Sequence, residues 1–188
     1  MRWSLNLGSI AGTAIRIHIT FLLFLLWLGT VFYQKGGAEA AWQGTIFILL
    51  IFLCVLLHEL GHVFAARHYG VKTRDVTLWP FGGIASMERM PDKPSEELIV
   101  AVAGPAVNVT IAAMLFMLVR PHLDVETLPK IDDPSVSLTA KVLGANIVLV
   151  VFNMIPAFPM DGGRVLRALL AVRMGNVRAT ETVSYTHL

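Results

Sequence analysis

The sequence predicts an all-α polytopic membrane protein with about four transmembrane helices and one short extended or hairpin-like loop. Two observations lead to this fold class. The chain has 188 residues, of which 55% are hydrophobic and 15% charged, and its mean hydropathy is +0.67. Soluble domains contain roughly 45–50% apolar and 25% charged residues. In addition, four apolar segments approach the ~20 residues needed to cross the hydrocarbon core of a bilayer.

The composition excludes several other classes of protein. Such a high apolar content excludes a disordered chain, and 15 glycines without a regular period exclude a collagen-like one. A single cysteine excludes a disulfide scaffold. The formal net charge of +2 gives no support for a nucleic-acid partner. The lipid bilayer is therefore the expected surrounding of this chain.

The predicted spans are residues 17–33, 46–66, 98–119 and 138–157. Lys and Arg favour the cytosolic side of a membrane, and their distribution sets the orientation. With both termini in the cytosol, only these of the 15 Lys and Arg residues lie outside: Lys35, Arg120, Lys130 and Lys141. We therefore expect an integral, multi-pass protein with cytosolic N- and C-termini.

The loop between the second and third spans contains a segment that is not helical. Residues 76–87 alternate apolar and small side chains around Gly82 and Gly83, and Pro80 interrupts any helix there. Such backbone is tolerated at membrane depth only where protein or a water-filled cavity satisfies its hydrogen bonds. The segment is therefore either the lining of a cavity or a hairpin on the surface.

The second span ends in the sequence HELGH. His58 and His62 are four residues apart, so their imidazoles share one face of a helix and can bind one metal ion. Glu59 is placed to act on water at that metal. Ionisable side chains in a spanning segment cost several kcal/mol unless they are paired, metal-bound or hydrated. We expect a functional site here. The alternative is an interfacial helix end, with His62 reaching toward lipid headgroups.

A catalytic zinc ion typically has three protein ligands and a water molecule. Asp161 is the candidate for the third ligand. It follows the fourth span on a segment that Pro156 and Pro159 break, at the same membrane side as His62. The alternative is that Asp161 caps a helix over residues 164–172. In the third span, Gly104 predicts close packing against a neighbouring helix.

Four motifs in order carry a family resemblance: HELGH, FGGIASM, AGPAVN and NMIPAFPMDGGR. Together they resemble the site-2 protease family of intramembrane zinc metalloproteases. The similarity is to the branch without an inserted PDZ domain, which includes sporulation pro-sigma-factor proteases and CBS-linked members. It covers about residues 10–180.

The resemblance implies a zinc-dependent endopeptidase with one zinc ion per chain. Its substrate would be a transmembrane protein, cleaved in or near a membrane-spanning segment. The family pattern implies that His58, His62 and Asp161 bind zinc and that Glu59 activates water. The active site would then face the cytosolic side of the membrane.

Three further residues take roles from the same resemblance. Asn153, eight residues before Asp161, is implied to hold substrate or the oxyanion, the alternative being a hydrogen bond to a neighbouring helix. Gly82 and Gly83 resemble the segment that pairs with unwound substrate.

The family usually continues beyond this point with further membrane helices and CBS or other domains. We therefore expect a metalloprotease core over residues 1–180, a polar tail over residues 181–188, and the absence of the family's C-terminal helices. A regulatory membrane partner and a homo-oligomer both stay open. Two other functions also stay open, namely a membrane metal or proton transporter and a non-catalytic membrane adaptor.

Overall fold

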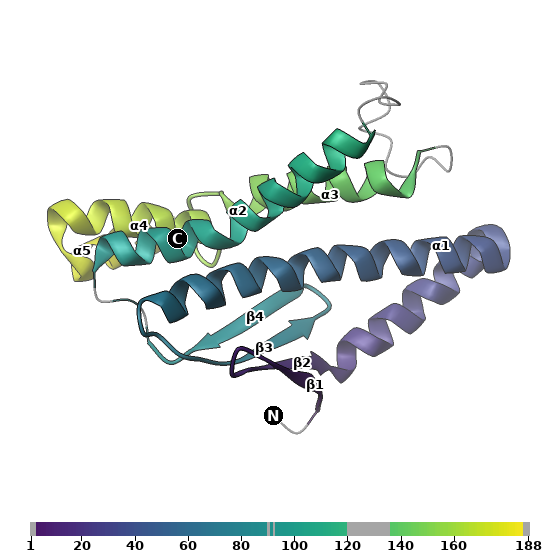
Figure 1. The fold of residues 1–188 in the computed structure, drawn as a ribbon, viewed down its shortest axis with the longest axis horizontal. Helices are drawn as coiled ribbons and strands as arrows, with labels where there is room; N and C mark the ends of the chain where they lie inside the picture. The colour runs from purple at the N-terminus through teal and green to yellow at the C-terminus, as the bar shows by residue number, and fades with distance from the viewer. Residues whose placement is uncertain (1–2, 90, 92, 120–135, 186–188) are drawn as a thin grey trace.

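A computed structural model describes residues 3–89, 91, 93–119 and 136–185. It is mostly helical, with one small sheet (Figure 1). The elements in chain order are β1 (Ser4–Ile10), β2 (Thr13–His18), α1 (Ile19–His68), β3 (Thr73–Trp79), β4 (Gly82–Met87), α2 (Pro94–Val119), α3 (Leu138–Asn153), α4 (Asp161–Met174) and α5 (Asn176–Tyr185).

Helix α1 is a helical hairpin rather than a straight rod. Gly36 and Gly37 have backbone angles outside the helical region, and Gly37 has a φ of +70°. The ring centroids of Phe21 and Phe52 are 4.4 Å apart. A straight helix would separate these two residues by about 46 Å. The chain therefore reverses at the two glycines.

We call residues 19–35 the first limb of α1 and residues 38–68 its second limb. Figure 1 shows the two limbs diverging from the turn, the first in purple and the second in blue. The segment expected as a loop, residues 34–45, is helical apart from the two glycines. Glycine is favoured at such a turn because it has no Cβ to resist a positive φ.

Two helices among the described residues are long and apolar enough to cross a membrane, α1 and α2. Helix α3 is also apolar but has 16 residues and ends at Asn153, before the expected end of the fourth span. The chain then turns through a segment containing Pro156 and Pro159, neither of which can continue the helical hydrogen-bond ladder. Four crossings therefore stay a prediction.

The sheet has the order β1-β2-β3-β4. The β3–β4 hairpin confirms the extended segment expected from the sequence. The β1–β2 hairpin, by contrast, makes the prediction of an all-α fold incomplete. Strand β2 alternates buried and more exposed residues, the pattern of a half-buried strand. Strands β2 and β3 pair in parallel, with Ala14 opposite Asp75, and α1 is the connection between them.

The second limb of α1 is the middle layer of the structure. The sheet packs on one side of it, where Ile15 and Val76 meet Leu60 and Val63. Helices α2 and α3 lie along the other side, with α4 and α5 beyond the start of α2 (Figure 1). The histidines of the HELGH sequence are therefore covered from several sides by protein.

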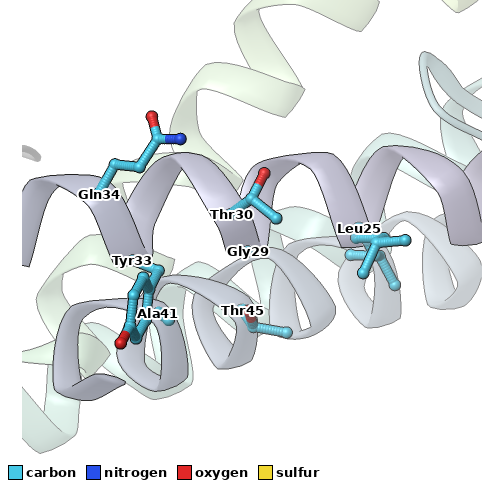
Figure 2. Close-up of a pocket in the computed structure, with 8 residues that line it drawn as sticks. Leu25, Gly29, Thr30, Tyr33, Gln34, Ala41 and Thr45 are labelled. Carbon is cyan, nitrogen blue, oxygen red and sulfur yellow. The ribbon is translucent and has the colours of Figure 1, made fainter. Parts of the chain in front are cut away.

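A groove of about 730 Å³ opens between the two limbs of α1 (Figure 2). We call it the hairpin groove. It lies near the turn at Gly36 and Gly37, and Thr45 on its wall is about 20 Å along the helix from His58. The groove is therefore separate from the HELGH sequence. Its lining is Leu25, Leu26, Gly29, Thr30, Tyr33, Gln34, Ala41 and Thr45.

Candidate metal centre

Three ligand-type side chains meet at the end of the second limb. Nε2 of His58 lies 3.0 Å from Oδ2 of Asp161, and Nε2 of His62 lies 3.1 Å from the same oxygen. The two Nε2 atoms are 3.1 Å apart. All three residues are buried, with at most 8% of any of them exposed. The structure therefore brings together the three residues expected as metal ligands, from positions far apart in the chain.

A chain of hydrogen bonds sets the orientation of His58. Nδ2 of Asn146 donates to the carbonyl oxygen of Val142 at 2.9 Å, which turns Oδ1 of Asn146 toward Asn108. Nδ2 of Asn108 donates to that Oδ1 at 3.0 Å, and its own Oδ1 then accepts from Nδ1 of His58 at 2.9 Å. Because Nδ1 donates, the lone pair of the neutral imidazole is on Nε2.

His62 is held in the same way by the backbone of α2. Its Nδ1 donates to the carbonyl oxygen of Val100 at 2.7 Å. Helix α2 comes this close because Gly104 has no side chain. A Cβ at Gly104 would overlap Nε2 of His62 and lie 2.8 Å from Nε2 of His58. The close packing expected at Gly104 is confirmed, and it occurs at the two histidines expected to bind the metal.

The three atoms suit a zinc ion. Ligand atoms around a tetrahedral zinc, with bonds of ~2.0–2.1 Å, are about 3.3 Å apart. The observed separations of 3.0–3.1 Å are close to that value. With both Nδ1 atoms donating, two imidazole lone pairs and a carboxylate oxygen face one another, an arrangement that a cation stabilises. The donor set of two His and one Asp therefore fits zinc, which takes nitrogen and carboxylate ligands.

Asp161 is the first residue of α4, and its side chain does not cap that helix. The N-cap residue is Met160, which makes no side-chain capping bond, and Oδ2 of Asp161 contacts the two imidazoles instead. Burial raises the pKa of the Asp161 carboxyl group, but imidazoles that carry a proton on Nε2, in the place a zinc ion would take, donate to Oδ2 and hold that pKa well below its ordinary value. The group is therefore ionised, as a metal ligand must be.

Glu59 lies beside the cluster and is covered by strand β4. A Cβ at Gly83 would lie 2.6 Å from Cγ of Glu59 and 3.3 Å from its Oε1. Gly82, with a φ of +143°, begins the same strand. Among the described residues β4 is an edge strand of the sheet. The glycine pair singled out in the sequence thus brings a strand edge against the expected catalytic carboxylate.

Asn153 makes a local contact. Its Nδ2 donates to the carbonyl oxygen of Leu149, one turn earlier in α3, at 3.0 Å, and its side chain is half-buried. This bond is within its own helix, so neither the bond to a neighbouring helix nor a contact with the three ligands is observed. The substrate or oxyanion role of Asn153 stays a prediction.

No motif in the sequence indicates which groups accept hydrogen bonds from the two histidines. Asn108 was visible as a polar residue in an apolar span, and it is 0% exposed in the structure. Asn146, also 0% exposed, carries the same signal in the fourth span. Polar side chains in apolar helices bond across helices, so their positions could have indicated partners for the metal ligands. The carbonyl of Val100 has no signal in the sequence.

Comparisons with known proteins relate this sequence to a family of peptidases. The sequence matches peptidase family M50 over residues 46–142 and 132–188. It is similar to a zinc metalloprotease of Methanocaldococcus jannaschii, with 39% identity over 181 residues that cover 96% of this chain and 50% of that protein. It is also similar to stage IV sporulation protein FB of Bacillus subtilis, with 29% identity over 128 residues that cover 68% of this chain and 41% of that protein.

A solved structure shares the fold as well. The site-2 protease from Methanocaldococcus jannaschii superposes with a TM-score of 0.70 at 34% sequence identity, covering 96% of this chain and 78% of the solved chain. The chain spans about half the length of the curated relatives it matches most fully. The matched residues include the HELGH sequence and Asp161. The chain therefore belongs to peptidase family M50, the site-2 protease family of zinc metalloproteases.

Proposed function

We propose that this chain is the core of a zinc-dependent intramembrane endopeptidase, which hydrolyses a peptide bond in or near a transmembrane segment of a membrane-protein substrate. The convergence of three buried ligand atoms, from His58, His62 and Asp161, carries the proposal. One zinc ion per chain suits this cluster, which is the one such group among the residues that the structure describes. Bound zinc supplies a Lewis acid that polarises the scissile carbonyl and lowers the pKa of water.

Glu59 is the general base in this proposal. It is the one carboxylate of the HELGH sequence, and it adjoins the ligands without being one of the three clustered residues. Glu59 takes the proton of the attacking water and delivers it to the leaving amine. Hydrogen bonds from Nδ1 of His58 to Asn108 and from Nδ1 of His62 to the Val100 carbonyl keep the imidazoles in the tautomer that this chemistry needs.

Strand β4 is the proposed substrate-binding edge. A transmembrane helix resists hydrolysis because its amides are engaged in internal hydrogen bonds, so the substrate must be unwound locally. An extended segment can replace those bonds by pairing with an exposed strand edge. Gly83 places the β4 edge beside Glu59, which supports pairing at the point of cleavage. Asn153 is proposed to contact the same substrate segment or its oxyanion.

The proposed topology has four crossings, made by the two limbs of α1, by α2 and by α3. Both termini are cytosolic, and the metal centre lies toward the cytosolic end of the second limb. The Lys and Arg residues described above support this orientation. The partners are the substrate, the lipid bilayer and, as a further proposal, a regulatory membrane partner or a second copy of the chain.

The decisive experiment pairs zinc analysis with cleavage of a transmembrane substrate in reconstituted protein. Glu59→Gln should keep one zinc per chain and lose cleavage by about 10³-fold or more, since the base is removed. Asp161→Ala should bind zinc much more weakly, through the two histidines alone, and should lose cleavage. Well-folded unsubstituted protein without zinc would contradict the proposal.

The same variants separate the alternatives. A metal or proton transporter would keep its flux in Glu59→Gln, because transport needs no base for hydrolysis. An adaptor would keep its partner binding in both variants. Loss of cleavage with retained zinc in Glu59→Gln is therefore expected of the peptidase and of neither alternative.

A further inference from the structure

The carboxylate of the metal centre comes from a different helix from the imidazoles. Asp161 is the first residue of α4, which packs on α2. Helix α2 also orients both imidazoles, through Asn108 and the Val100 carbonyl. The place of the Asp161 carboxylate relative to the histidines therefore depends on how α4 is fixed to α2.

A buried ion pair joins these two helices. Nε of Arg167, on α4, donates to Oε1 of Glu97, on α2, at 2.8 Å, and Nη2 of Arg167 contacts the same oxygen. The exposed fractions of the side chains are 5% for Glu97 and 17% for Arg167. Nη1 of Arg167 also donates to Oγ1 of Thr180, on α5, at 3.3 Å. A guanidinium held by several of its donors fixes both direction and distance.

The ion pair lies close to the groups that orient the metal ligands. Glu97 is in the first turn of α2, three residues before Val100, whose carbonyl accepts from His62. Residues three apart are neighbours on one side of a helix. Arg167 follows Asp161 by six residues, a rise of about 9 Å along α4. The start of α2 thus contacts both parts of the metal centre. Val100 binds His62, and Glu97, on the same side of the helix, binds α4 through Arg167.

We propose that Glu97 and Arg167 are a positioning pair, which fixes Oδ2 of Asp161 against the Nε2 atoms of His58 and His62. A buried ion pair adds little to folding compared with apolar side chains of the same size, so its geometric specificity is the better account of its presence. The hydrogen bonds of Arg167 go to Glu97 and Thr180 rather than to the three ligand atoms. The inference rests on the proposed zinc centre and adds to it two residues that position its ligands.

The first test measures zinc affinity by chelator competition in detergent-purified protein. Glu97→Gln should bind zinc at least tenfold more weakly than the unsubstituted chain. The matched control is Glu96→Gln, on the adjacent residue of the same helix, which pairs with Lys93 at 3.2 Å where the lysine side chain is 76% exposed. Glu96→Gln should leave zinc affinity unchanged. Equal affinities of folded Glu97→Gln and unsubstituted protein would overturn the proposal.

A second measurement separates positioning from general loosening of the fold. In an Asp161→Ala background, Glu97→Gln should cause no further loss of zinc affinity, because the pair acts through Asp161. A second tenfold loss in that background would overturn the proposal. The charge-swapped protein with Glu97→Arg and Arg167→Glu should recover part of the affinity lost by Glu97→Gln.

If Glu97→Gln does not fold, Arg167→Lys replaces it in the measurement of zinc affinity. It keeps the positive charge but lacks the fixed geometry of the guanidinium, so zinc affinity should fall several-fold in a folded protein. An unchanged affinity would contradict the positioning role. If the unsubstituted chain binds no zinc, the proposed function fails together with this inference; if it binds zinc and both variants bind equally, only the positioning pair fails.

Discussion

The two ends of the second limb of α1 differ in how they are packed. At the metal end His58 and His62 are buried, and each ring nitrogen has a polar contact. At the hairpin end the limbs border an apolar groove, where a Cβ added to Gly29 would lie 3.7 Å from Oγ1 of Thr45 (Figure 2). One helix therefore combines a tightly constrained site with a loosely filled surface, and equivalent substitutions at the two ends should have unequal effects.

A pair of Gly→Ala substitutions gives the largest expected contrast. In Gly104→Ala the added methyl group would overlap Nε2 of His62. Zinc affinity should therefore fall about 100-fold or more, because loss of an outer-shell partner alone costs about 10- to 100-fold in affinity. Gly29→Ala meets only Oγ1 of Thr45 at an ordinary contact distance and should leave zinc affinity unchanged. Chelator competition measures both. Equal affinities would mean that the metal end is no more constrained than the groove.

Zinc itself should stabilise the metal end. At a free concentration about 100 times its Kd, a ligand that binds only the folded state adds about 2.7 kcal/mol to the free energy of unfolding. Thermal unfolding in detergent, with zinc and with a chelator, measures this gain as a rise in Tm. Asp161→Ala should lose most of the gain. A gain that is as large in Asp161→Ala would place the metal elsewhere.

The hydrogen-bond chain behind His58 should have the next largest effect. Asn108→Leu removes the acceptor of Nδ1 and frees the imidazole to adopt the other tautomer, so zinc affinity should fall about 10- to 100-fold. Thr110→Val is the control, because Thr110 is exposed and its hydroxyl donates to the Ala106 carbonyl of its own helix. Zinc titration of the two variants checks the difference. If Asn108→Leu binds zinc as tightly as the unsubstituted chain, Asn108 does not orient His58 for metal binding.

The smallest effect is expected inside the hairpin. A Cβ at Gly44 would overlap the ring of Phe32, so Gly44→Ala forces the limbs apart and should cost about 1–3 kcal/mol of stability. Zinc affinity should stay the same, because the overlap is about 20 Å along the helix from His58. A lower Tm with unchanged zinc binding is the expected pair of results. Weaker zinc binding would show that the two ends are coupled.

The cluster of the three expected metal ligands was predictable because its signals are local. A helix alone is enough to place His58 and His62 on one face, and the two prolines before Asp161 indicate that the helix of the fourth span has ended. The β3–β4 hairpin was equally visible from Gly82 and Gly83. These features depend on short stretches of sequence, in which backbone preference and residue type decide the outcome.

The supporting contacts were not predictable because they join segments that lie far apart in the chain. Fifty residues separate His58 from Asn108, and 70 separate Glu97 from Arg167. The β1–β2 hairpin was missed for a related reason. Its strands have the same lengths as β3 and β4, but β2 completes the sheet only by pairing with β3 beyond the whole of α1. Tertiary pairing, rather than local propensity, decides these elements.

The parallel pairing of β2 with β3 has a consequence for the order of assembly during synthesis. Because α1 separates the two strands, their pairing must wait until both limbs of α1 have been made. Asp161 comes later still, 99 residues after His62. A growing chain therefore carries the two histidines and Glu59 through translation and insertion without the third ligand. On the proposed assignment, the set of three metal ligands is complete only after α4 has docked.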